Sequence, residues 1–75
     1  MKLYRISQTT NQDYDTFDSA VVSARNEDEA RNMHPSGPGA GLWTWTDPAH
    51  VTVELIGTAT RGTKAGVIVA SYNAG

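Results

Sequence analysis

Two tryptophans and a histidine, Trp43, Trp45 and His34, flank a run of the chain that is rich in glycine and proline. An indole ring can stack on a flat ligand or anchor an interface, and it can equally fill a small hydrophobic core. Trp43 and Trp45 are two residues apart, so both rings would point the same way if the segment is extended. The pair therefore either packs in a core or interface, or stacks on a ligand.

A second group of residues could bind an anion or line a pocket. Arg61 and Lys64 lie in a turn, from which side chains are free to reach a ligand. His34, at the end of a short helix, either interacts with the helix dipole or donates to a phosphate. Tyr72 and Asn73 lie at the end of a strand, where they either fray or line a pocket or interface at the sheet edge. The candidate ligand-binding residues are Tyr14, His34, Trp43, Trp45, Arg61, Lys64, Tyr72 and Asn73.

The carboxylates form no catalytic pattern that can be read from their spacing. Asp13, Asp15 and Asp18 lie near one loop, and a pair of them could in principle do acid–base or metal work. They lack the spacing and central glycine of a calcium-binding loop, and turn formation accounts for Asp13 and Asp15. We therefore expect no enzyme, no catalytic residue, no metal site and no cofactor.

Residues 35–41 invite interpretation as a phosphate-binding loop because they are rich in glycine. Such a loop precedes a helix and ends in lysine followed by serine or threonine. This one follows a predicted helix and contains no lysine. We predict a flexible connector over about 35–47, which either forms a lid over a ligand or joins the core.

The length of 75 residues allows one domain, residues 1–75. A chain this short buries only roughly 60% of its unfolded surface and is marginal as a monomer. Cysteine is absent, which excludes disulfides and thiolate–zinc sites, and two histidines are too few for an all-histidine site. Small domains are usually stabilised by disulfides, a metal or oligomerisation, and only oligomerisation is left here. We therefore expect a homo-oligomer.

Charge and hydrophobicity limit which partners and which cellular location can be expected. The net charge is −2 and the six basic residues are spread along the chain, so no nucleic-acid partner is expected. No apolar stretch approaches the roughly 20 residues of a membrane span, nor is there one of signal-peptide length. With no cysteine, these features predict a cytoplasmic protein without membrane contact.

The hydrophobic periodicity predicts an α+β domain in the order ββαββ, an antiparallel four-stranded sheet with one short helix. Asn26 is a good N-cap, Glu29 can return the bond to its backbone, and Pro35 ends the helix after about two turns. Residues 61–64 are interpreted as the turn of a hairpin. The predicted strands are residues 2–8, 17–24, 51–59 and 66–72.

The second and fourth strands carry apolar residues on both faces. In the second strand, alternation places Phe17 and Val21 on one face and Ala20 and Val22 on the other. Burying one valine or isoleucine contributes roughly 1.5–3 kcal/mol, and a single two-turn helix cannot cover the whole sheet. We therefore predict that the remaining face is covered either by another subunit or by the loop with its tryptophans.

Five segments of the chain, residues 2–8, 14–22, 27–31, 34–35 and 67–75, have a familiar pattern. In these segments the chain resembles a family of short phage and prophage proteins without established function. The resemblance covers most of the chain apart from the Gly/Trp loop, and it transfers no functional residues because no activity is established in the family.

The resemblance implies a phage protein that acts against host defence, in the cytoplasm of the host cell. The expected function is a non-enzymatic sponge, which sequesters a small nucleotide-type immune signal in an inter-subunit pocket. The alternative is an inhibitor that binds and blocks a host defence protein through its sheet face or an edge strand.

Overall fold

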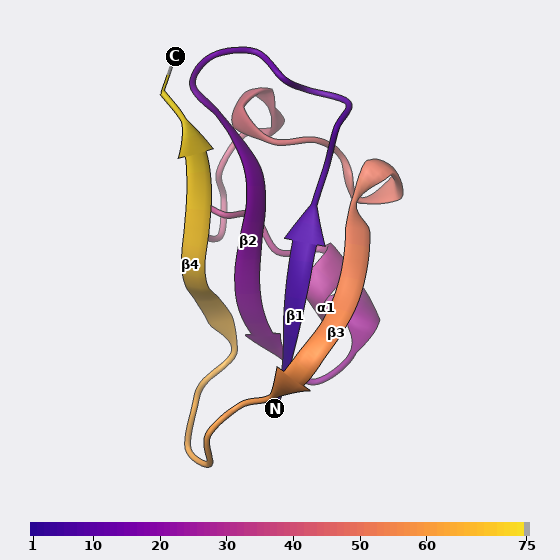
Figure 1. The fold of residues 1–75 in the computed structure, drawn as a ribbon, viewed down its shortest axis with the longest axis vertical. Coiled ribbons are helices and arrows are strands. Elements are labelled where there is room, and N and C mark those ends of the chain that lie inside the picture. Colours follow the sequence, from indigo (N-terminus) through magenta and orange to yellow (C-terminus); the bar gives the residue numbers. More distant parts are fainter. Residues whose placement is uncertain (75) are drawn as a thin grey trace.

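The alternating β-branched and aromatic segments form the four strands of one antiparallel sheet, with a helix between the second and the third strand (Figure 1). The computed structural model describes residues 1–74, so Gly75, the last residue of the resembling segments, lies outside them. The predicted α+β class and ββαββ order are confirmed. The elements are β1 (Lys2–Ser7), β2 (Thr16–Ala24), α1 (Glu27–Arg31), η1 (Leu42–Thr44), η2 (Pro48–His50), β3 (Thr52–Thr58) and β4 (Gly66–Asn73).

The strand order across the sheet is β3-β1-β2-β4. The hairpin of β1 and β2 occupies the centre, and β3 and β4 form opposite edges (Figure 1). The predicted hairpin around 61–64 is therefore wrong, because the central hairpin separates the two strands that this turn connects. The connection is fixed along its path by the Ala59 N–H, which donates to the Met1 carbonyl over 3.1 Å, and by the Ser23 hydroxyl, which donates to the Lys64 carbonyl.

Helix α1 begins at the predicted N-cap. The Asn26 side chain accepts from the Glu29 N–H over 2.8 Å, while the Glu29 carboxylate accepts from the N–H of Arg25 over 3.1 Å. The capping box predicts that the Glu29 carboxylate accepts from the N–H of Asn26. It accepts instead from the residue before the cap. The helix has only five residues, fewer than the two turns predicted, and Ala30 alone is buried. None of the helices within residues 1–74 has the length and apolar content needed to cross a membrane.

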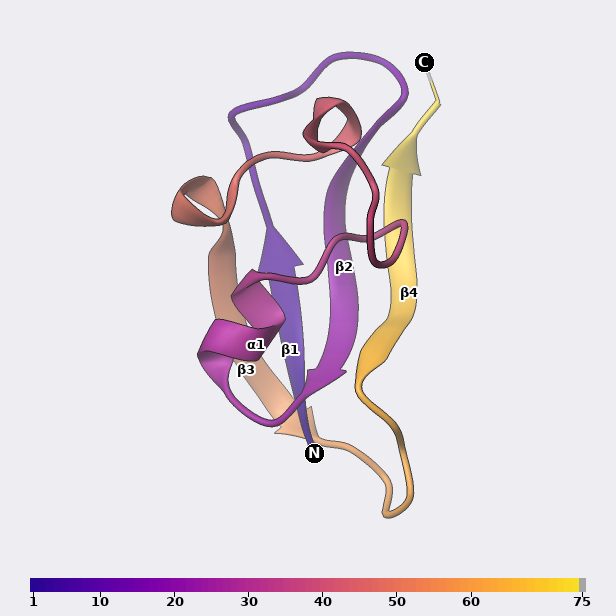
Figure 2. The same ribbon diagram turned by 180° about the vertical axis from the view of Figure 1, so that it is seen from behind.

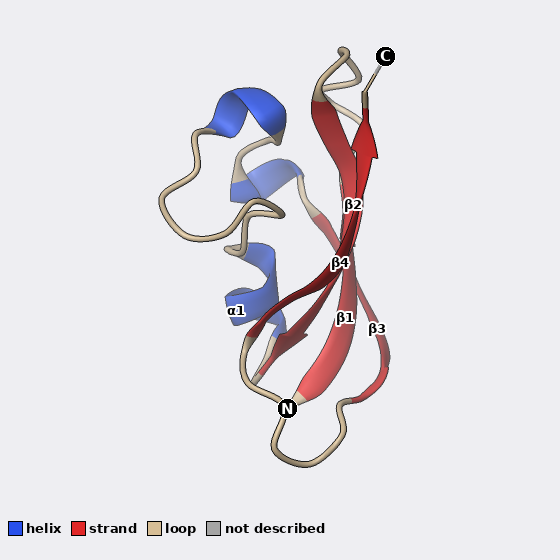
Figure 3. Cartoon of the chain, turned by 90° about the vertical axis from the view of Figure 1, so that its left-hand side faces the viewer, coloured by secondary structure: helices blue, strands red, loops and turns tan. Residues whose placement is uncertain are grey.

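The core lies between one face of the sheet and a layer made of α1 and the chain that follows it. Figures 2 and 3 show α1, η1, η2 and their connections on the same side of the sheet. Trp45 is only 2% exposed and fills the space that the short helix leaves over the strands. The loop with its tryptophans was one of two covers predicted for the remaining face, but it lies on the same face as α1, so within residues 1–74 it does not cover the opposite face. The buried apolar residues are Tyr4, Ile6, Ala20, Val22, Ala24, Ala30, Trp45 and Val51.

The opposite face of the sheet is richer in polar and small residues than the sequence pattern predicted. Residues paired across antiparallel strands share a face. One row on this face consists of serines, since Ser7 pairs with Ser19 and Ser19 with Ser71. The next row joins Arg5, Val21 and Val69. An antiparallel sheet can expose such a face to water, so this face alone does not require a covering subunit.

Phe17 lies on the other face from the one predicted. The register shifts between Phe17 and Ser19, where Asp18 is the additional residue, and such a bulge reverses the alternation of the strand. Phe17 consequently packs against the core and not beside Val21. Its ring meets Tyr72 edge-on at 4.8 Å between centroids and His34 at 6.3 Å.

The cap of α1 predicts an acid-sensitive component of stability. The backbone N–H of Arg25, and then its guanidinium, hold the pKa of Glu29 below its ordinary value of 4.5. A depressed pKa contributes stability above the unfolded value, and this stability is lost as the pH falls through the folded one. Glu29→Gln should therefore lower the urea midpoint at pH 7, and the difference from the parent should shrink below about pH 4.5.

Asp28→Asn is the matched control, because it removes a charge from the same turn without breaking the bonds to Arg25. It should leave the Glu29-dependent acid profile in place. A parent and a Glu29→Gln variant with parallel pH profiles would contradict this assignment.

Candidate functional site

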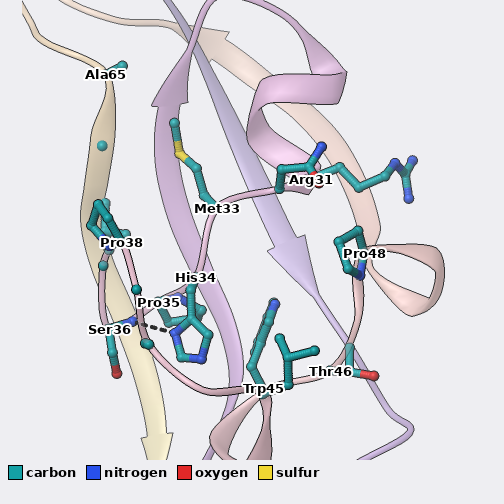
Figure 4. A pocket seen from close by; sticks show the side chains of 17 residues that line it. Arg31, Met33, His34, Pro35, Ser36, Pro38, Trp45, Thr46, Pro48 and Ala65 are labelled. Carbon is teal, nitrogen blue, oxygen red and sulfur yellow. Dashed lines mark hydrogen bonds between the residues drawn. The ribbon is translucent and has the colours of Figure 1, made fainter.

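A cleft of about 520 Å³ opens between the loop after α1, the segment that follows Trp45, and the start of β4 (Figure 4). Its lining is mainly apolar, and its volume lies within the range of pockets for small ligands. Trp45 forms one wall, and Pro38 faces it from the side of β4. The residues that line it include Arg31, Met33, His34, Pro35, Pro38, Leu42, Trp45, Pro48, Ala65, Gly66 and Val67.

His34 determines the path of the loop that bounds this cleft. Its Nδ1 accepts from the N–H of Ser36 over 2.9 Å, and its Nε2 lies 2.9 Å from the carbonyl oxygen of Gly41. Since a carbonyl only accepts, this bonding pattern assigns the proton to Nε2. Both ring nitrogens are thus engaged with the loop backbone, and the ring is only 9% exposed. In this conformation His34 is a loop anchor, and neither nitrogen is directed at a phosphate.

The two tryptophans do not point the same way. Residues Leu42–Thr44 form a 3-10 turn, closed by the Trp45 N–H to the Leu42 carbonyl over 3.0 Å, and not an extended segment. Trp45 is consequently buried while Trp43 is 79% exposed. The Trp43 ring lies against Gly41, where an added Cβ would be 1.7 Å from Cζ3 of the indole. Trp45 is therefore the core and cleft residue of the pair, and Trp43 is on the surface.

A buried amide network that sequence reasoning missed ties this segment to the sheet. Gln8 is 5% exposed and donates to the carbonyls of Asn11 and Phe17 over 2.7 and 2.8 Å. The Asn11 side chain in turn donates to the carbonyls of Trp43 and Trp45, each over 3.0 Å. The available signal was alternation, because Gln8 continues the buried face of β1 two residues after Ile6.

The remaining candidate residues are distributed over both ends of a molecule 36 Å long. Tyr72 and Asn73 line a second, more polar hollow of about 580 Å³ beside Gln8. Tyr14 is 75% exposed on the β1–β2 loop at the same end. Arg61 and Lys64 lie in the connection at the opposite end (Figure 1). One small ligand within a single chain cannot contact all of them, although Lys64 adjoins Ala65 of the first cleft.

The charged groups around these hollows are few. Arg31 lines the first cleft, but its guanidinium donates to the Val51 carbonyl and pairs with Glu27 over 3.3 Å. At the second hollow, desolvation and then the Asp15 carboxylate raise the pKa of the Tyr72 hydroxyl. Tyr72 is therefore a neutral hydrogen-bonding group at physiological pH.

Comparisons of the chain with models of known protein families, with curated protein sequences and with solved structures find no match. Within residues 1–74, no three side chains of the metal-ligating kinds lie together. The fold and the cleft define a small α+β domain whose second layer is a loop with a hollow beside the sheet edge. The resemblance to phage proteins remains a prediction.

The anchoring role of His34 can be tested by His34→Phe. This substitution keeps a ring between Phe17 and Trp45 but leaves the Ser36 N–H and the Gly41 carbonyl without their partner. We expect a loss of about 1–3 kcal/mol in the free energy of unfolding, measured by urea denaturation.

His50→Phe is the control, because His50 is an exposed histidine paired only with the carboxylate of Asp47. Exposed ion pairs contribute little, so this variant should lose less than about 1 kcal/mol. Equal losses in the two variants would contradict the assignment of His34 as an anchor.

Proposed function

We propose that this protein is a non-catalytic binding protein that holds a small, flat ligand of the nucleotide type in the cleft beside Trp45. The observation that carries the proposal is the cleft itself, about 520 Å³ bounded by the loop after α1 and the start of β4. Binding without turnover needs an apolar wall and a few polar groups, and no nucleophile or base. Its mechanism is removal of the ligand by mass action.

The chemistry of the lining favours a ring over a sugar or a peptide. Of the rings in the lining, Pro38 is exposed and offers a flat apolar surface against which a base can pack, whereas Pro35 and Trp45 are buried and leave little surface for a ligand. Lys64, next to the lining residue Ala65, is the exposed cation closest in sequence to the cleft and is our candidate for a phosphate.

The biological setting proposed for this activity comes from the resemblance to short phage and prophage proteins. A phage protein in the cytoplasm of the host cell that removes a nucleotide-type immune signal would counteract host defence as a sponge. Identifying the ligand is the first experimental step toward testing this setting.

The test is a thermal-shift panel of cyclic dinucleotides, cyclic trinucleotides and ADP-ribose derivatives. We expect at least one compound to raise Tm, and the compound should be recovered unchanged when the complex is denatured. Ala65→Trp, which places a large ring at the exposed rim of the cleft, should abolish the shift. Ala49→Trp, at an exposed position outside the lining, should retain it.

Three results would overturn the proposal. A panel without any shift would remove the ligand class, and recovery of an altered compound would indicate an enzyme. Equal loss of the shift in Ala65→Trp and Ala49→Trp would place binding outside the cleft.

A second function is favoured by Trp43 and Leu42, which are 79% and 52% exposed next to each other on η1. Exposed tryptophans are over-represented among the residues that dominate protein interfaces. An inhibitor that blocks a host defence protein could use this pair. In that case Trp43→Ala would abolish capture of the host protein, whereas the nucleotide panel would show no shift in the parent protein.

A further inference from the structure

Strand β4 forms an edge of the sheet that lacks the charges and prolines that usually protect an edge from pairing, although its register with β2 shifts at Ile68. It pairs only with β2 and lies at the left of Figure 1 with no element outside it in residues 1–74. Its eight residues, Gly66–Asn73, include no charged residue and no proline. Ile68 and Val69 are 53% and 59% exposed. Natural edge strands normally carry charges or prolines that prevent pairing with another chain.

The other edge strand differs in this respect. Strand β3 carries Glu54 in its centre, paired across the sheet with Arg5. A carboxylate at this position opposes the approach of another apolar strand. The two edges are therefore not equivalent, and β4 is the one suited to pairing.

Charges of opposite sign lie beyond the two ends of β4. Arg61 and Lys64, both exposed, precede its first residue. Its last residue adjoins the acidic part of the β1–β2 loop, because the Asp15 N–H donates to the Asn73 carbonyl over 2.6 Å. Asp13 and Asp15 are exposed there. The strand thus runs from a basic end to an acidic end.

We infer that a second copy of the chain pairs with β4 in antiparallel orientation and forms a continuous eight-stranded sheet. Two antiparallel copies of one strand are related by a two-fold axis, so the contact is closed and does not propagate into fibres. The antiparallel arrangement sets the basic end of each copy against the acidic end of the other, which gives the charge attraction twice. A parallel arrangement would set like charges together.

This pairing also bears on the cleft, and that part of the inference rests on the proposed function. Ala65, Gly66 and Val67 line the cleft and belong to the beginning of β4 or precede it directly. Antiparallel pairing brings the other end of the neighbouring β4 to this point, and with it Tyr72 of the partner subunit. An aromatic ring from one copy and Lys64 from the other would then border the same ligand.

The test is the mass in solution by light scattering, measured without any nucleotide. The parent protein should have twice the mass of the 8.1 kDa chain. Val69→Lys, which places a charge on the β4 edge, should reduce it to a single chain. Leu55→Lys is the matched control, since Leu55 is 58% exposed on β3, and should remain a dimer.

Charge reversal supplies a second test that does not depend on the fold of Val69→Lys. Arg61→Asp/Lys64→Asp in one chain and Asp13→Lys/Asp15→Lys in another should each weaken self-association, because each sets like charges together. Mixing the two variants should restore a dimer of one chain of each kind. A monomeric parent, dissociation by Leu55→Lys alone, or a mixture that does not associate would overturn the inference.

These outcomes are separable from those of the proposed function. A monomer that binds a nucleotide would overturn the β4 dimer and leave the cleft proposal standing. A dimer that gives no thermal shift would support the pairing and overturn the nucleotide proposal.

Discussion

A five-residue helix has to share the covering of a four-stranded sheet with another part of the chain, and most of the structure follows from this constraint. The connection from α1 to β3 supplies the rest of the second layer, and its largest buried side chain is Trp45. Irregular backbone over a core needs hydrogen-bond partners. His34 supplies them within the loop, and Asn11, which is hydrogen-bonded to Gln8, supplies them from the connection between β1 and β2.

The same constraint explains why the hollow lies where it does. A loop anchored at a few points crosses a sheet without filling every space beneath it, whereas a long helix would present a continuous packed stripe. Between the anchors at His34 and Trp45, the loop stands off from the start of β4 and leaves the cleft. The connection from α1 to β3 therefore both covers the core and forms the cleft of the proposed binding function.

The sequence predicted the local structure correctly but not the long-range arrangement of the strands. Strand alternation and the Asn26 cap are local signals, so the four strands and the start of the helix were predicted correctly. A turn at 61–64 is also a local signal, but it does not specify which strands pair, and β3 and β4 lie on opposite edges. Trp43 lies within the 3-10 turn Leu42–Thr44 and Trp45 directly follows it, and no residue pattern predicted this turn. Of the candidate site, only His34 and Trp45 meet at the cleft.

The central claim is that Trp45 is buried by its own chain and thereby holds the second layer on the sheet. The direct test is acrylamide quenching of Trp45 fluorescence in Trp43→Phe, a substitution at a position 79% exposed. We predict an emission that is strongly protected from the quencher and equally protected at all protein concentrations. Quenching as efficient as that of free tryptophan, or protection that disappears on dilution, would contradict the account.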